Sequence, residues 1–224
     1  MADLKRQLNG ETPLIAVNPG GLAVPVADAL GGHSNVAVFI DCERTPVGVT
    51  EAATMARAAQ ANGLYSVLRT ESSDPAIVTR YLDCKVDGLV LPQMESAAQC
   101  AAVYRAMQTH AATARPTSFI AQIESVAGHA ALDEIVQTIG IDAILIGPND
   151  LAASMGLAGQ PQHPDVIAAV SDIAERVRAA GLPFGLPVQA STARDWAQRG
   201  ARLFYVALAH LLADGLKPLK EATT

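Results

Sequence analysis

The sequence predicts a (β/α)₈ TIM barrel made of a single domain that spans residues 1–224. Short apolar runs rich in β-branched residues recur along the chain, which is typical of parallel strands buried on both faces. Helix-length segments separate these runs. The strand–helix unit occurs eight times at a mean spacing of roughly 27 residues, close to that of a barrel of about 250 residues. No linker or break in composition divides the chain.

The repeats give the expected elements in order. Strands are expected at residues 13–18, 36–41, 65–70, 88–93, 117–124, 143–150, 183–188 and 203–208. Helices are expected at 21–30, 49–62, 74–83, 96–110, 164–180, 192–200 and 209–222, with a helical stretch between the fifth and sixth strands and a longer excursion at 151–164. A doubly wound open sheet is the competing architecture. It usually has a glycine-rich GxGxxG turn after the first strand, and the Asn-Pro-Gly-Gly at 18–21 is not one.

Composition excludes several classes of protein. The formal net charge of −6 and the pI near 5.3 argue against a nucleic-acid-binding surface. There is no basic run to attract an anionic membrane, and no apolar stretch approaches the roughly 18 residues that would span one. Three cysteines without CxxC spacing fit a reducing compartment. Since the N-terminus is polar and lacks a signal-peptide core, we expect a cytoplasmic protein.

Polar residues gather at the carboxyl ends of the expected strands, where barrel active sites lie. Burying such groups without partners is costly, so their concentration at one edge favours a site. The residues at these ends are Asn18, Asp41, Glu43, Arg44, Arg69, Gln93, Gln122, Glu124, Asn149, Asp150, Gln189 and His210.

Two of these acids are candidate metal ligands. Gln122 and Glu124 are two apart on one strand and point to the same face, and Asp150 ends the next strand. Oxygen ligands of this kind hold Mg²⁺ or Mn²⁺ with positions open for water or substrate. Two structural alternatives remain. Asp150 could cap the turn that follows it, and Glu124 could lie in the first turn of the next helix.

The neighbouring residues suggest how an anionic substrate would be held. Gly147, Pro148 and Asn149 let backbone come close to a ligand, and N–H groups near the start of a short helix could cradle a carboxylate. Arg69 carries a fixed charge that could stabilise an enolate oxygen. The alternative for Arg69 is a structural ion pair with Glu43 or Asp41.

From about Leu14 onward, the chain resembles the HpcH/HpaI-type class II pyruvate aldolases. The most specific stretches are Gln-Ile-Glu-Ser at 122–125, Gly-Pro-Asn-Asp-Leu-Ala-Ala-Ser at 147–154 and His-Pro-Asp-Val at 163–166. Arg69 with Asp-Pro at 74–75, and Leu-Pro-Gln-Met-Glu at 91–95, also fit the family pattern. The resemblance implies a metal-dependent lyase that forms or cleaves a 4-hydroxy-2-oxo acid, from pyruvate and an aldehyde, through a metal-bound enolate.

The resemblance also implies roles for individual residues. Glu124 and Asp150 would hold a divalent metal (Mg²⁺, Mn²⁺ or Co²⁺), with Gln122 nearby and backbone groups at Asn149 and Asp150 on the pyruvate carboxylate. Arg69 would face the enolate oxygen. Asp83 matches an acid that approaches the site from a neighbouring subunit. The family usually forms homo-oligomers, hexamers built of dimers that exchange C-terminal helices.

One residue departs from the family pattern. The family usually has Asp-Gly-Glu-His after the second strand, where the aspartate orients a histidine that handles the proton of the aldol hydroxyl. Here Asp41 is followed by Cys42, Glu43 and Arg44. Arginine stays protonated in proteins, so Arg44 is no conventional base. A metal-bound water or another residue could replace the histidine, or Arg44 could bind an anionic substrate. His210 is the one histidine expected near the catalytic edge, and a structural role is its alternative.

Because Arg44 stands where the family has a histidine, two other functions remain as alternatives. A related lyase, either an oxo-acid decarboxylase or a malyl-type thioester lyase, is the enzymatic alternative, since decarboxylation needs no base for a hydroxyl. A homologue that binds an oxo acid without turnover is the other. We expect small-molecule substrates, and neither nucleic acid nor membrane as a partner.

Overall fold

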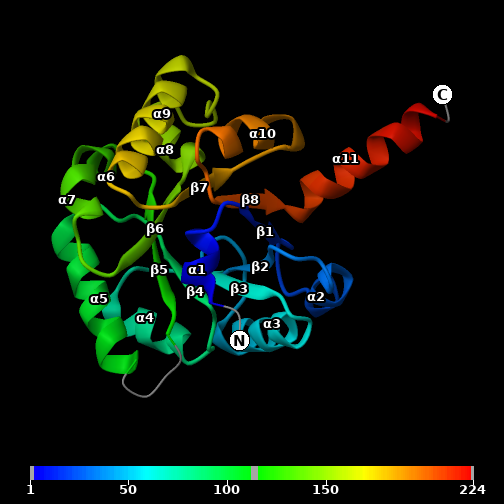
Figure 1. Ribbon diagram of the computed structural model, residues 1–224, viewed down its shortest axis with the longest axis horizontal. Helices are drawn as coiled ribbons and strands as arrows, with labels where there is room; N and C mark the ends of the chain where they lie inside the picture. The colour runs from blue at the N-terminus through cyan, green and yellow to red at the C-terminus, as the bar shows by residue number, and fades with distance from the viewer. Residues whose placement is uncertain (1–2, 112–115, 223–224) are drawn as a thin grey trace.

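A computed structural model of the chain describes residues 3–111 and 116–222. Eight parallel strands close into a barrel in chain order, β1 to β8, and β8 pairs with β1 (Figure 1). This confirms the predicted (β/α)₈ barrel. The strands are β1 Leu14–Asn18, β2 Val36–Asp41, β3 Tyr65–Arg69, β4 Gly88–Leu91, β5 Ser118–Ile123, β6 Ile141–Ile146, β7 Phe184–Pro187 and β8 Leu203–Ala207.

Helices surround the barrel and connect successive strands (Figure 1). They are α1 Leu4–Leu8, α2 Val24–Leu30, α3 Val49–Ala61, α4 Pro75–Leu82, α5 Ala97–Ala111, α6 Val126–Ala130, α7 Leu132–Val136, α8 Pro148–Ser154, α9 Pro164–Ala179, α10 Ala190–Gln198 and α11 Leu208–Glu221. None of the helices in the described part of the chain is long and apolar enough to cross a membrane.

Alternation along each strand divides the buried residues into two layers, because successive side chains of a strand point to opposite faces. On β1, Leu14 and Ala16 join the cluster that fills the barrel. The larger cluster lies between the strands and the surrounding helices, and β8 contributes Phe204 and Val206 to it. The apolar runs in the sequence are therefore continuous because residues on both faces of the strands are buried, with Ile15 on β1 as an exposed exception.

The sixth predicted strand was too long. Residues 143–150 were expected to be extended as far as Asp150, but β6 ends at Ile146 and α8 begins at Pro148. Proline at the first helical position fits a helix start, since it has no N–H to leave unpaired. Asp150 therefore lies in the first turn of α8 and not at the end of a strand, and α8 continues into the region 151–164 that was expected to be an excursion.

Helix α1 closes one end of the barrel and was not expected from the sequence. Its buried side chains, Leu4 and Leu8, pack into the cluster that fills the barrel. Lys5 fixes the helix to β6 through an ion pair with Asp142, 2.8 Å between Nζ and Oδ1. The polar N-terminal segment thus covers the end of the barrel opposite the carboxyl ends of the strands.

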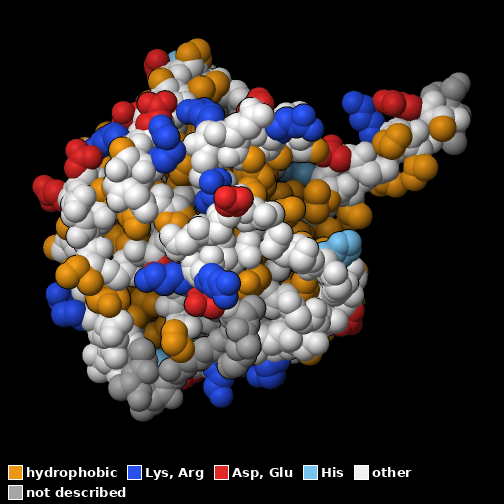
Figure 2. Space-filling view, in the orientation of Figure 1, with side chains coloured by type: hydrophobic (Ala, Val, Ile, Leu, Met, Phe, Trp, Pro, Cys, Tyr) orange, Lys and Arg blue, Asp and Glu red, His pale blue; other side chains and the backbone are white. Residues whose placement is uncertain are grey.

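Helix α11 extends away from the barrel (Figure 1). None of its residues is buried, and its leucines 211, 212, 216 and 219 are between 40% and 64% exposed. Figure 2 shows hydrophobic side chains along this helix and on the adjoining surface of the barrel. Ile15, which points outward from β1, is 38% exposed. The C-terminal helix therefore leaves the outer face of β1 partly uncovered.

Candidate active site

A pocket of about 530 Å³ opens at the carboxyl ends of the strands. The last residues of six strands line it, as do residues from the loops that follow β1, β2 and β6. Its lining residues are Asn18, Pro19, Gly20, Phe39, Asp41, Arg44, Thr45, Arg69, Gln122, Leu145, Ile146, Gly147, Pro148, Asn149, Asp150, Pro187, Tyr205, Ala207 and Ala209. The structure thus brings most of the predicted site residues to one concave surface.

Glu124 is a buried carboxylate beside this pocket. It directly follows β5, and its side chain is only 2% exposed. One carboxylate oxygen accepts the backbone N–H of Gln93 at 2.9 Å, and the other accepts the side-chain amide of Gln122. Burial raises the pKa of Glu124 to about 7, and the negative charges of Glu43 and Asp150 add to the effect. Helix α6 begins only at Val126, with Ser125 as its N-cap, so Glu124 does not belong to a helical first turn.

Gly147 allows Glu124 to sit this close to the neighbouring strand. A Cβ at position 147 would lie 2.7 Å from both Cβ and Oε2 of Glu124, and 3.2 Å from Nε2 of Gln122. No side chain fits at that separation. Glu124 itself is not a lining residue of the pocket, but Gly147 and Gln122, which contact it, are.

Gln93 has an unusual backbone conformation that serves the same carboxylate. Its φ angle of +53° is uncommon for a residue other than glycine. This conformation accompanies the hydrogen bond from its N–H to Glu124 and the one from the next residue, Met94, to the carbonyl of Gln122. Backbone strain of this kind concentrates at functional sites.

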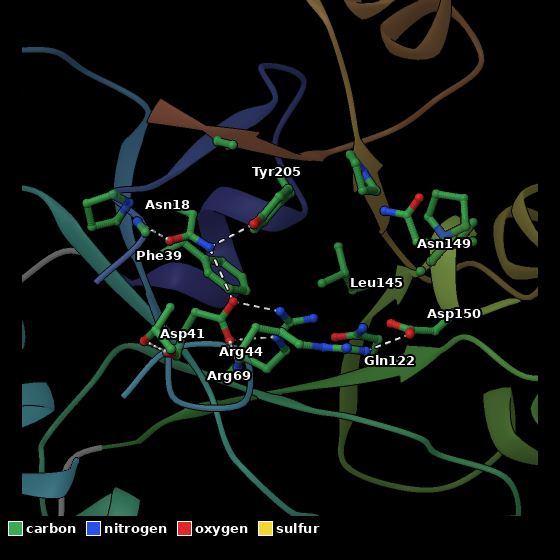
Figure 3. Close-up of a pocket in the computed structure, with 18 of the residues that line it drawn as sticks. Asn18, Phe39, Asp41, Arg44, Arg69, Gln122, Leu145, Asn149, Asp150 and Tyr205 are labelled. Carbon is green, nitrogen blue, oxygen red and sulfur yellow. Dashed lines mark hydrogen bonds and ion pairs between the residues drawn. The ribbon is translucent and has the colours of Figure 1, made fainter. Parts of the chain in front are cut away.

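Asp150 meets an arginine from the opposite side of the pocket. The Nη2 atom of Arg44, in the loop after β2, donates to Oδ1 of Asp150 at 2.5 Å (Figure 3). Helix α8 has Gly147 as its N-cap and no side-chain cap, so Asp150 is not the cap that the sequence left open as an alternative. Its carboxylate instead faces the pocket, 35% exposed.

Asp41 organises the other half of the pocket. Both of its oxygens are engaged by Arg69, at 3.0 Å from Nε and 2.6 Å from Nη2. Oδ1 also accepts the backbone N–H groups of Glu43 and Arg44, at 3.2 Å each. Asp41 therefore anchors both Arg69 and the loop that carries Arg44.

Arg69 is paired in the way that its structural alternative described. Besides Asp41, its Nη1 lies 3.1 Å from Oε2 of Glu43, which is in ion-pair contact but accepts no hydrogen bond there. Burial lowers the pKa of Arg69, but the hydrogen bond and charge of Asp41, together with the charges of Glu43 and Glu124, raise it, and the net pKa is raised. Arg69 also lines the pocket, so the same guanidinium is both anchored and exposed to a ligand.

Neither Tyr205 nor Asn18 has a role predicted from the sequence, apart from the position of Asn18 at the end of a strand. The side-chain amide of Asn18 donates to the Tyr205 hydroxyl at 2.7 Å and to Oδ2 of Asp41 at 3.3 Å (Figure 3). Phe39 packs edge-on against the Tyr205 ring, with 4.9 Å between ring centroids. The sequence signal for Tyr205 was a single polar atom in an apolar run, which also describes an ordinary buried tyrosine.

Two predicted residues lie away from the pocket within this chain. Asp83 is the C-cap of α4 and pairs with His110, 3.0 Å from Oδ1 to Nε2. His210 was expected at the end of β8, but that strand ends at Ala207 and His210 is exposed on α11. Neither lines the pocket. The role of Asp83 in a neighbouring subunit stays a prediction.

The residues beside the pocket fit a divalent cation. The carbonyl oxygen of the Gln122 side chain is buried and has no hydrogen-bond partner, and Glu124 next to it is a carboxylate removed from water. Among the described residues there is no cluster of three or more His, Cys, Asp or Glu side chains placed for a metal. Such an ion would depend on Glu124, Asp150 and oxygens of water or substrate, which is how magnesium is usually held.

The fold and the pocket define a class of protein: a (β/α)₈ barrel with two carboxylates, Glu124 and Asp150, and the largely buried Arg69 at the carboxyl ends of its strands. The model of the HpcH/HpaI aldolase/citrate lyase family matches residues 27–208. The chain belongs to this family, as its motifs predicted.

Relatives and solved structures agree with this assignment. A 2-dehydro-3,6-dideoxy-6-sulfogluconate aldolase of Pseudomonas putida is 30% identical, over 71% of this chain and 72% of its own length. A hydroxypyruvate/pyruvate aldolase of Pseudomonas aeruginosa is 29% identical, over 89% and 84%. The crystal structure of a family protein from Burkholderia cenocepacia J2315 superposes with a TM-score of 0.89 at 26% identity, covering both chains fully.

Proposed function

We propose that this chain is a metal-dependent pyruvate aldolase that cleaves a 4-hydroxy-2-oxo acid to pyruvate and an aldehyde, or runs in reverse. The observation that carries the proposal is the buried Glu124 carboxylate, which sits beside an unpaired Gln122 oxygen at the catalytic edge of the barrel. The names of its aldolase relatives support the same activity.

Different residues would bind the metal, hold the substrate carboxylate and stabilise the enolate. Glu124 and Asp150 would hold Mg²⁺, Mn²⁺ or Co²⁺, and the ion would supply Lewis-acid polarisation of the keto group. Pro148 and Asn149, with Gly147, form the pocket wall where the oxo-acid carboxylate is expected. Arg69 stabilises negative charge that develops on the substrate oxygen, because Asp41 holds its guanidinium in a fixed position.

The proton of the aldol hydroxyl needs a different acceptor from the one the family usually has. The described residues that line the pocket include no histidine, Arg44 remains protonated, and both oxygens of Asp41 already accept hydrogen bonds. This observation favours a second candidate function, decarboxylation of an oxo acid, which breaks a C–C bond without deprotonating a hydroxyl. Comparing the release of pyruvate from a 4-hydroxy-2-oxo acid and from oxaloacetate discriminates between the two.

The direct test is deuterium exchange at the methyl group of pyruvate, which requires enolate formation but no aldehyde. We expect exchange with Mn²⁺ or Mg²⁺, loss of exchange with EDTA, and at least a hundredfold loss in Glu124→Gln and in Asp150→Asn. Arg176→Gln, which removes an ion-pair network on α9 outside the pocket, is the matched control. Exchange that is absent, or that resists EDTA, would show the proposal to be wrong.

We also propose that α11 packs against a second copy of the chain. Four half-exposed to exposed leucines on one protruding helix, and Ile15 on the uncovered face of β1, support a homo-oligomer. Light scattering should give a mass above that of one chain. Leu212→Asp combined with Leu219→Asp should lower it, whereas Lys217→Asp, on the same helix, should not. An unchanged mass in the double variant would contradict this assembly.

A cytoplasmic setting completes the proposal. All three cysteines are free thiols, and all three are buried. Burial raises the pKa of the Cys42 thiol to about 12, so it is an inert apolar group beside the site. Buried free thiols of this kind fit a reducing compartment.

A further inference from the structure

Arg44 joins two sides of the pocket. It lies in the loop after β2, and its guanidinium reaches across to Asp150 on α8 (Figure 3). Nη2 is 2.5 Å from Oδ1 of Asp150, while Nε is 3.8 Å from Oε2 of Glu43, a carboxylate that Arg69 already engages. The Arg44 side chain is 53% exposed. Its close anionic partner is therefore Asp150, the same residue expected to bind the metal.

A divalent cation and the Arg44 guanidinium would compete for the same carboxylate, that of Asp150. Asp150 can satisfy the cation only by weakening or giving up its bond to Arg44, and two cations placed side by side repel each other. Once Asp150 turns to the ion, Arg44 keeps its full charge and lines a pocket that a substrate enters. A free guanidinium with planar N–H groups is well suited to a carboxylate.

The position of Arg44 indicates which end of the substrate carries the carboxylate that it would bind. The oxo-acid end of a substrate is expected against the turn at Gly147 and Pro148, on the α8 side. Arg44 comes from the opposite wall, next to Asp41 and Thr45. Once Asp150 turns to the ion, the guanidinium no longer reaches across to α8, and it would lie with the rest of Arg44 on the wall that faces the part of the substrate that leaves as the aldehyde.

We propose that Arg44 competes with the divalent cation for Asp150 and, when displaced, binds a carboxylate carried by the aldehyde substrate. The inference rests on the proposed aldolase function for its second half only. The competition for Asp150 is a property of binding alone and can be measured without any turnover.

The first experiment measures Mn²⁺ affinity by electron paramagnetic resonance of free Mn²⁺, with no organic anion present. Arg44→Gln should bind Mn²⁺ about two- to fivefold more tightly than the unaltered chain, the range expected for a half-exposed ion pair. Arg44→Lys, which keeps the charge, should stay within twofold. If Arg44 only orients Asp150, Arg44→Gln will weaken Mn²⁺ binding, and equal or weaker affinity overturns the proposal.

Two controls make this result specific. In an Asp150→Asn background, the Arg44→Gln substitution should tighten binding less than in the unaltered chain, because the shared partner is gone and only the repulsion between the two cations remains. Arg176→Gln should leave the Mn²⁺ affinity unchanged. Thermal melts of each variant identify misfolding. If Arg44→Gln does not fold, Arg44→Met in the same titration decides the question.

The second experiment compares two four-carbon aldehydes with pyruvate as donor: succinic semialdehyde, which carries a carboxylate, and butanal, which does not. Arg44→Gln should lower the ratio of their kcat/KM values at least tenfold, mainly through KM for the anionic aldehyde. Arg44→Lys, which keeps the positive charge, should retain part of the preference for the anionic aldehyde. An unchanged ratio overturns the assignment of Arg44 to the aldehyde. Absence of deuterium exchange in the unaltered enzyme would instead overturn the proposed function, and the Mn²⁺ titration would still test the competition.

Discussion

Substituting Gly147 by alanine should disable the metal site while leaving the barrel folded. The added methyl group would lie 2.7 Å from both Cβ and Oε2 of Glu124, and the Cβ contact cannot be relieved by rotating the end of the side chain. The backbone at Gly147, with φ of −104° and ψ of 86°, has a negative φ, so no left-handed conformation penalises alanine. The effect should therefore come from displacement of Glu124 and of the Gln122 amide next to it.

The expected size follows from overpacking in a close-packed interior. Inserting one methyl group into such a contact typically costs about 1–3 kcal/mol. For a domain of this length, each kcal/mol lowers the melting temperature by about 2–4 °C, which gives a decrease of about 2–12 °C. Mn²⁺ affinity should fall further, by at least tenfold, because Glu124 must move from the position where Gln93 and Gln122 hold it.

Calorimetric melts test the predicted decrease in melting temperature, and Mn²⁺ titrations test the predicted loss of Mn²⁺ affinity. Gly215→Ala is the matched control, since nothing lies within 4 Å of a Cβ added there. That site is inside α11, where alanine is favoured over glycine by about 1 kcal/mol. The control should keep normal Mn²⁺ affinity and melt at the same temperature or slightly higher. If Gly147→Ala binds Mn²⁺ as tightly as the unaltered chain does, Glu124 is not a metal ligand in the arrangement described.

Three further predictions follow from the same contacts. Since burial raises the pKa of Glu124 to about 7, protons compete with Mn²⁺ below that pH, and the Mn²⁺ dissociation constant should rise about tenfold per pH unit there and level off above about pH 8. Glu124→Gln should remove this slope. Leu8→Ala should cost about 2–5 kcal/mol in chemical denaturation, because Leu8 is fully buried in the end of the barrel. Asp41→Ala should cost about 3–5 kcal/mol, because it leaves the buried Arg69 charge without its main partner.

The fold was predictable because its signal repeats. Nearly every strand residue is buried whichever face it points to, so eight continuous apolar runs appear at nearly regular intervals, and one misplaced boundary does not change the count. Boundaries were less predictable where a short helix follows a strand directly. The run that ends at Ile146 is followed by Pro148, and the proline marks a helix start only if the turn at Gly147 is recognised.

Proximity within the site was predictable only over short distances in sequence. Gln122 and Glu124 share one strand, so period-two geometry alone brings them together, and the structure shows their side chains in contact. Asn18 and Tyr205 are 187 residues apart and meet because β8 pairs with β1. Closure of the barrel creates that neighbour relation, and no local pattern along the chain records it.

The Arg44–Asp150 pair shows why the residue that departs from the family is also the hardest to interpret from sequence. The sequence showed that Arg44 could not act as a base, but its partner lies 106 residues away across the pocket. The Arg44 and Asp150 side chains are both partly exposed, so each could pair with several other groups. Asp41 determines which partner Arg44 has. It accepts hydrogen bonds from two backbone N–H groups in the loop of Arg44, and it also pairs with Arg69. With Asp41 and Glu43 committed to Arg69, Asp150 is the carboxylate left for Arg44, so the anchor of one arginine determines what the other can bind.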